Sequence, residues 1–144
     1  YIQNSLEEPL EKGKKYKLSF YIALSDSSEF TSDHIGVDFS VMPNGISSFA
    51  PEPLLSSRNS LHISIPNSQN NHQWIKVEAE FVARGGEGYM IIGSFRPNMT
   101  EKEYRKRLKK NLLNCSNSEC AAYYYVDEVF LEELIPETNY PKFR

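Results

Sequence analysis

The sequence predicts an all-β protein folded as an antiparallel β-sandwich. Segments in which apolar and polar residues alternate recur along the chain, and turn-forming residues separate them, a pattern typical of short sandwich strands. The last such segment, residues 123–131, is rich in tyrosine and β-branched residues, which favour strands. Nine Tyr and eight Phe among 144 residues also suit a protein with aromatic pairs across neighbouring strands.

Seven strands are expected in chain order. They are residues 1–6, 15–24, 35–41, 61–65, 74–83, 89–95 and 123–131. In residues 74–83 the apolar positions should face inward, because lysine and glutamate alternate with them and favour water. The segment Gly85–Gly88 is expected to join its two flanking strands as a hairpin. In the last strand, alternation predicts one face with Tyr125, Asp127, Val129 and Leu131, and the other with Tyr124, Val126, Glu128 and Phe130.

A single helix is expected from about Thr100 to Leu113. Thr100 followed by Glu103 is a capping-box signature at a helix start. Apolar residues then recur at a spacing of four, as in an amphipathic helix. Its opposite face is basic and has two interpretations: a solvated surface, or a contact with a partner. The partner-contact residues would be Lys106, Lys109 and Lys110.

Length and charge restrict the class of protein. We expect one domain, residues 1–134, followed by a tail or linker, residues 135–144. The net charge of −3 gives no general attraction to nucleic acid. The chain contains no stretch of about 20 apolar residues, so no membrane-spanning helix is predicted.

Cys115 and Cys120 enclose a short polar segment. A chain that doubles back there can close a disulfide, which would indicate an oxidising compartment. The alternative is a pair of free thiols. A zinc site is the least favoured interpretation, because no third cysteine or histidine lies close by in sequence.

Motifs for catalysis are lacking in the sequence. His34, His62 and His72 lie in three separate segments without the spacing of metal ligands. The glycine-rich segment at residues 85–88 opens no predicted helix, so it reads as a turn and not as a phosphate-binding loop. We therefore predict that the protein is not an enzyme and requires no cofactor.

Several segments together resemble a known family. They are Leu18–Asp26, Asp33–Ser40, Gly85–Phe95 and Tyr124–Val129, with Trp74 opening a strand between them. In this order and spacing the chain resembles the jelly-roll module of Bacteroidetes surface proteins, which often precedes an OmpA-like domain. The resemblance covers roughly residues 1–132, with residues 44–72 and 100–113 as variable insertions.

The resemblance implies a jelly-roll sandwich of the galactose-binding-like type, exported to the cell surface, outer membrane or periplasm. It implies a non-catalytic role in protein assembly or adhesion, including secretion or gliding machinery, with other envelope or surface proteins as partners. The alternative is a carbohydrate-binding module that recognises a glycan through aromatic side chains.

Asp127 has two interpretations. Relatives in the wider fold hold a structural calcium through an acid in the last strand, and Asp127 is the corresponding position. Calcium requires several oxygen ligands at once. The other interpretation is a buried acid that accepts hydrogen bonds from backbone amides or a tyrosine hydroxyl.

A sugar site would combine aromatic faces with polar side chains that reach hydroxyl groups. The candidate ligand-binding residues are Tyr21, Phe49, Arg58, Asn59, Gln73, Trp74 and Tyr124. Core packing or cross-strand pairing is the competing explanation for most of them, and above all for Trp74, because buried aromatics dominate protein cores.

Overall fold

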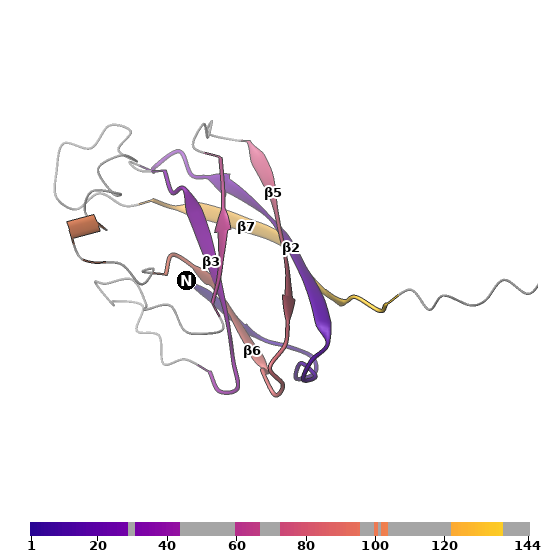
Figure 1. Cartoon of the computed structure of the whole chain (residues 1–144). Coiled ribbons are helices and arrows are strands. Elements are labelled where there is room, and N and C mark those ends of the chain that lie inside the picture. Colours follow the sequence, from indigo (N-terminus) through magenta and orange to yellow (C-terminus); the bar gives the residue numbers. More distant parts are fainter. Residues whose placement is uncertain are drawn as a thin grey trace, which may run out of the picture.

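The computed structural model describes residues 1–28, 31–43, 60–66, 73–95, 100, 102–103 and 122–136. It contains seven strands (Figure 1): β1 (Ile2–Ser5), β2 (Lys15–Leu24), β3 (His34–Ser40), β4 (Leu61–Ser64), β5 (Trp74–Val82), β6 (Tyr89–Gly93) and β7 (Tyr124–Glu133). All seven coincide with predicted segments, so the all-β prediction is confirmed.

The strands form two antiparallel sheets with a β-sandwich-like arrangement. One sheet has the order β1-β6-β3-β4 and the other the order β5-β2-β7. Among the described strands, β3 and β4 are the one consecutive pair that shares a sheet. Every other connection passes from one sheet to the other, so each sheet is assembled from strands that are distant in sequence.

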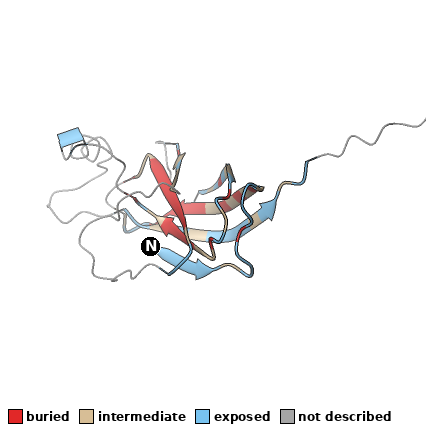
Figure 2. Cartoon of the chain, turned by 60° about the horizontal axis from the view of Figure 1, so that its bottom comes forward, coloured by how far each residue is buried: buried red, intermediate tan, exposed pale blue. Residues whose placement is uncertain are grey.

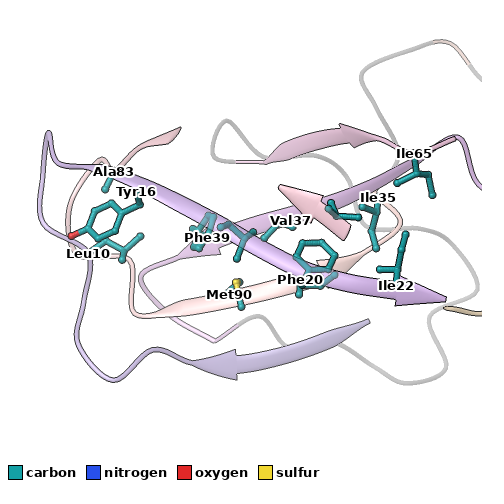
Figure 3. Packing of buried hydrophobic residues seen from close by; sticks show 13 residues of the cluster. Leu10, Tyr16, Phe20, Ile22, Ile35, Val37, Phe39, Ile65, Ala83 and Met90 are labelled. Carbon is teal, nitrogen blue, oxygen red and sulfur yellow. The ribbon is translucent and has the colours of Figure 1, made fainter. Parts of the chain in front are cut away.

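The core lies between the two sheets, and β2 contributes its centre. Leu18, Phe20 and Ile22 alternate along β2 and are completely buried. Val37 and Phe39 of β3 face them from the opposite sheet, as Figure 3 shows. Strand β3 is buried over nearly its whole length, whereas all four residues of β1 are exposed (Figure 2).

The predicted hairpin at Gly85–Gly88 is wrong, because β5 and β6 belong to different sheets. The segment is a corner between the sheets, and Glu87 organises it. The Glu87 side chain is 3% exposed, and its two carboxylate oxygens accept hydrogen bonds from the backbone N–H groups of Arg84 and Gly85, both at 2.8 Å. Gly85 and Gly86 have φ of 99° and 90°, values that glycine adopts without steric cost.

This corner pairs with the β1–β2 connection, which also passes between the sheets. The N–H of Leu10 donates to the carbonyl of Glu87 at 2.9 Å, and the N–H of Gly86 donates to the carbonyl of Leu10 at 2.8 Å. The two connections thereby satisfy each other's backbone groups at one end of the sandwich.

The two predicted faces of β7 are correct only for its first half, because a β-bulge interrupts the strand. Tyr21 pairs with Asp127, while Ser19 pairs with Phe130, so β7 advances three residues where β2 advances two. Glu128 within the bulge has φ of 49°. After the bulge the faces exchange: Phe130 points outward beside Asp127, and Leu131 packs against the core with Tyr124 and Val126.

An aromatic contact between Tyr1 and Phe95 lies on the outer face of the four-stranded sheet. Phe95, just beyond β6, is almost fully buried, and its ring lies against Gly36 of β3. Tyr1 packs edge-on against Phe95 with ring centroids 5.6 Å apart, and its hydroxyl donates to the carbonyl of Ser94 at 2.5 Å.

The predicted capping box at Thr100 is present. The N–H and hydroxyl of Thr100 donate to Oε2 of Glu103 at 2.9 and 2.7 Å, which holds the pKa of Glu103 below its usual value. Lys102 and Glu103 are helical. The remainder of the predicted helix, with Lys106, Lys109, Lys110, Cys115 and Cys120, lies outside the described residues.

Candidate functional site

The outer face of the β5-β2-β7 sheet brings together two exposed aromatic side chains. Ala23 of β2 pairs with Trp74 of β5 on one side and with Tyr125 of β7 on the other. Trp74 is 48% exposed and Tyr125 is 59% exposed. One row across the sheet therefore reads tryptophan, alanine, tyrosine, with the small residue at the centre.

This row forms a shallow hollow of about 240 Å³, lined by Ala23, Leu24, Asp26, Trp74 and Tyr125. Asp26 follows the end of β2 and supplies a carboxylate to a lining that is otherwise apolar or aromatic. We call these five residues the aromatic hollow. Apolar and aromatic walls with a few polar groups are the usual composition of a small-molecule site.

The next row of the same face reads Lys76, Tyr21 and Asp127. Nζ of Lys76 lies 2.9 Å from Oε1 of Glu78. Its partner Glu78 also contacts Lys17 at 3.1 Å. Hydrogen bonds from Lys76, and secondly from Lys17, hold the pKa of Glu78 below its usual value. The charges beyond the second row are therefore largely paired with one another.

Asp127 lies on this exposed face and not in the core, so the buried-acid interpretation is wrong. Its position follows from its pairing with Tyr21 on the outer face of β2, and its Oδ1 accepts the N–H of Glu128 at 2.8 Å. No group of three or more metal-ligating side chains occurs within the described parts of the chain. A structural calcium at Asp127 stays a prediction.

The structure brings some of the predicted ligand residues together. Trp74 and Tyr21 share the outer sheet face, and Gln73 is exposed directly before Trp74. The interpretation of Trp74 as a core residue is wrong, because the side chain projects from the outer face. Phe49, Arg58 and Asn59 lie outside the described residues.

Tyr124 is on the opposite face from Trp74. Its ring packs against the core, and its hydroxyl accepts the N–H of Ser32 at 2.8 Å. The neighbouring residue Tyr125 takes the place beside Ala23. The alternation in the sequence already placed Tyr124 and Tyr125 on opposite faces of β7. It did not indicate which of the two faces is inward, and therefore which tyrosine lies on the same face as Trp74.

Two histidines that are distant in sequence also meet. His34 of β3 and His62 of β4 have ring centroids 5.8 Å apart. Nδ1 of His34 lies 2.7 Å from Oδ1 of Asp33, and its Nε2 is buried without a hydrogen-bond partner. Two imidazoles fall short of the three protein ligands typical of a catalytic zinc site.

Comparison of the chain with family models, with curated proteins and with solved structures finds no match. Within the described part of the chain, no helix has the length and apolar character needed to cross a membrane.

Proposed function

We propose that this chain is a non-catalytic binding module of a bacterial cell-surface protein, and that it binds glycans on the outer face of the β5-β2-β7 sheet. The observation that carries the proposal is the pair of exposed aromatic side chains, Trp74 and Tyr125, on either side of Ala23. The jelly-roll topology and the relation to OmpA-associated modules of Bacteroidetes belong to this proposal and come from the sequence resemblance.

The chemistry of the aromatic hollow suits a sugar. Sugar rings present patches of C–H groups that pack on aromatic faces, while their hydroxyls need polar partners at the edge. The Trp74 and Tyr125 rings supply the apolar surfaces, and Asp26 supplies an acceptor in the same lining. Apolar side chains that are exposed close together on one face commonly mark a binding site.

Protein assembly is the second candidate function, and a different part of the same face favours it. Phe130 is 64% exposed, and Val129 beside it is also exposed. Val129 lies within the bulge of β7 and Phe130 directly after it, away from the aromatic hollow, on an edge strand that has β2 as its neighbour. An exposed edge strand with apolar side chains is a surface on which another protein can dock.

A glycan microarray probed with the purified chain tests the proposal. We expect binding to a subset of glycans, and a loss of at least tenfold in the Trp74→Ala and Tyr125→Ala variants, because stacking surfaces are removed. Val82→Ala is the matched control: Val82 is an exposed residue at the far end of β5, and its removal should leave binding unchanged.

Two results would redirect the proposal. Equal binding by Trp74→Ala and the wild type would place the glycan elsewhere on the molecule. If no glycan binds, and Phe130→Ala weakens the capture of another envelope protein while Trp74→Ala does not, the chain is a protein-assembly module.

A further inference from the structure

We infer that the edge of β7 that faces away from β2 binds an extended segment of a partner protein as an added strand, and that this segment alternates apolar with basic residues. The inference makes no use of the aromatic hollow, so it is independent of glycan binding. It gives the second candidate function, protein assembly, a binding mode and a partner chemistry.

The two layers of the sandwich have unequal numbers of described strands, four and three. On one side the layers meet, because their outermost strands, β4 and β5, are in contact. On the other side the outermost strands are β1 and β7, and these two make no contact with each other. The described strands therefore leave the sandwich open beside β7, where the three-stranded sheet has no further strand.

Apolar side chains line this open side on both layers. Ile2 of β1 pairs with the core residue Ile92 and so points to the inner side, yet it is 50% exposed. On β7, Val126 and Leu131 pack against the core but are only partly buried, and no residue of this strand is fully buried (Figure 2). A strand added beside β7 would remove apolar surface from water, which stabilises the complex.

The backbone of β7 has hydrogen-bonding groups that point to the open side. The N–H of Ser25 donates to the carbonyl of Tyr123, and the N–H of Leu134 donates to the carbonyl of the first residue of β2. Alternate residues of an antiparallel strand bond to opposite sides. Counted from these two bonds on either side of the bulge, Val126 and Leu131 direct their N–H and C=O groups away from β2. An extended peptide can pair with such groups by β-strand addition.

The bulge limits which segments can pair with this edge. Glu128 has φ of 49°, and β7 has one more residue here than the facing part of β2. An incoming strand therefore meets two short runs, Tyr124–Asp127 and Phe130–Glu133, and not one continuous ladder. Bulges reduce the pairing of an edge with arbitrary strands, so the side chains of the partner must supply additional affinity.

The charges of β7 define the partner. Asp127, Glu128 and Glu132 are exposed, and β7 contains no lysine or arginine. None of these three carboxylates forms an ion pair within the described parts of the chain, whereas Glu133 is paired with Lys14. Opposite charges on neighbouring strands attract, and like charges destabilise the pair. A segment with basic residues on the outer face and apolar residues on the inner face therefore fits the edge.

The same charges argue against a second copy of this chain as the partner. Two β7 strands placed side by side would bring together four acidic residues from each copy, with no basic residue on either strand. This arrangement is unfavourable because like charges on neighbouring strands repel. The net charge of −3 on each chain adds to the repulsion. We therefore assign the edge to a basic segment of a different protein.

The test uses the full chain and three synthetic peptides with blocked ends, each as long as β7, ten residues. The first alternates valine with lysine, and the second alternates valine with glutamate. The third has the side chains of the first but methylated backbone nitrogens, which cannot donate hydrogen bonds. Fluorescence anisotropy at low ionic strength should show at least tenfold tighter binding of the first peptide than of either other peptide. Added salt should weaken this binding, because exposed charges are screened.

Hydrogen exchange measured by NMR locates the bound peptide. The lysine peptide should slow the exchange of the Val126 and Leu131 amides at least fivefold, because these amides gain hydrogen bonds. The amides of Tyr125 and Glu132 point toward β2 and should be unchanged, as should those of β5 at the other edge of the sheet. If Val126 and Leu131 already exchange as slowly as Tyr125 and Glu132 without peptide, the edge is occupied and the inference is wrong.

Paired substitutions test the charges at equal net charge. Glu128→Gln combined with Glu132→Gln should reduce the preference for the lysine peptide over the glutamate peptide to less than threefold. Glu7→Gln combined with Glu8→Gln is the control, because it removes the same number of charges at exposed positions outside the strands, and the tenfold preference should remain. Trp74→Ala should bind the lysine peptide as the wild type does, which separates this edge from the aromatic hollow.

Three further results would overturn the inference. Equal binding of the lysine peptide and its methylated form would show that no strand is added. Equal binding of the lysine and glutamate peptides would remove the charge argument. Protection of the Val126 and Leu131 amides that rises with protein concentration, without any peptide, would make a second copy the partner. None of these results bears on glycan binding, which the Trp74→Ala variant tests on the glycan array.

Discussion

The ring of Phe95 occupies the space that a side chain on Gly36 would fill. A Cβ atom at Gly36 would overlap Cδ2 of Phe95 and would lie 3.1 Å from the carbonyl oxygen of Gly93. Phe95 is almost fully buried there, so neither group has room to move. The outer face of the four-stranded sheet thus depends on a glycine in the middle of β3.

Gly36→Ala should lower the free energy of unfolding by about 1–3 kcal/mol, the usual cost of forcing extra atoms into a packed site. Gly88→Ala is the control, because a Cβ there meets nothing within 4 Å. Chemical denaturation of both variants checks the prediction. Equal stability of the two would mean that Phe95 adjusts without cost.

Glu87→Gln should destabilise the corner between β5 and β6. The carboxylate accepts two backbone hydrogen bonds while buried, and an amide can accept with only one of its two terminal atoms. The expected loss is about 1–3 kcal/mol, the cost of a buried donor left unsatisfied. Glu80→Gln, which breaks an exposed ion pair with Lys15, should cost at most about 1 kcal/mol. A smaller loss for Glu87→Gln than for Glu80→Gln would contradict this role of Glu87.

Glu128→Gly should stabilise the protein. Glu128 has φ of 49°, a left-handed conformation that costs an L-residue about 1–2 kcal/mol, and glycine removes most of that cost. Glu132→Gly, in the regular part of β7, should instead lose about 0.5–1 kcal/mol. Thermal unfolding of the pair provides the comparison, and a parallel loss in both variants would show that the bulge is not strained.

Stability in acid should depend on Glu78. Its pKa is lowered by Lys76 and Lys17 from the ordinary value of 4.5, so the folded state favours the charged form. That contribution is complete above pH 4.5 and is lost as the pH falls through the lowered pKa. Glu78→Gln should therefore flatten the decline in unfolding free energy below about pH 4.5. Glu7→Gln, at an exposed position outside the sheets, should keep the wild-type decline.

Cys115 and Cys120 are predicted to be bonded to each other. Both lie outside the described residues, so the prediction rests on the sequence. Alkylation of the unreduced, denatured protein followed by mass spectrometry should show no modified cysteine. Two alkylated thiols would show that the disulfide is absent.

The sequence by itself determined the strands and, for residues 74–83, the inward face. Residues 15–24 have the predicted bounds, and the predicted strand at residues 74–83 ends one residue earlier, at Val82, with the buried face that its alternation predicted. A strand's alternation is a local property, because successive side chains of a strand point to opposite faces whatever the neighbouring strands are. The capping box at Thr100 is local in the same way, since its two partners are three residues apart.

Only the tertiary structure decided how the strands are combined. The glycines at 85–86 suggested a hairpin, yet Glu87 and Leu10 turn that segment into a corner between sheets. The bulge at Glu128 exchanged the faces of β7 in a strand whose sequence alternates without a visible break. The aromatic hollow arose because Trp74 and Tyr125 both pair with Ala23. These features depend on contacts between segments far apart in the chain, which no local pattern encodes.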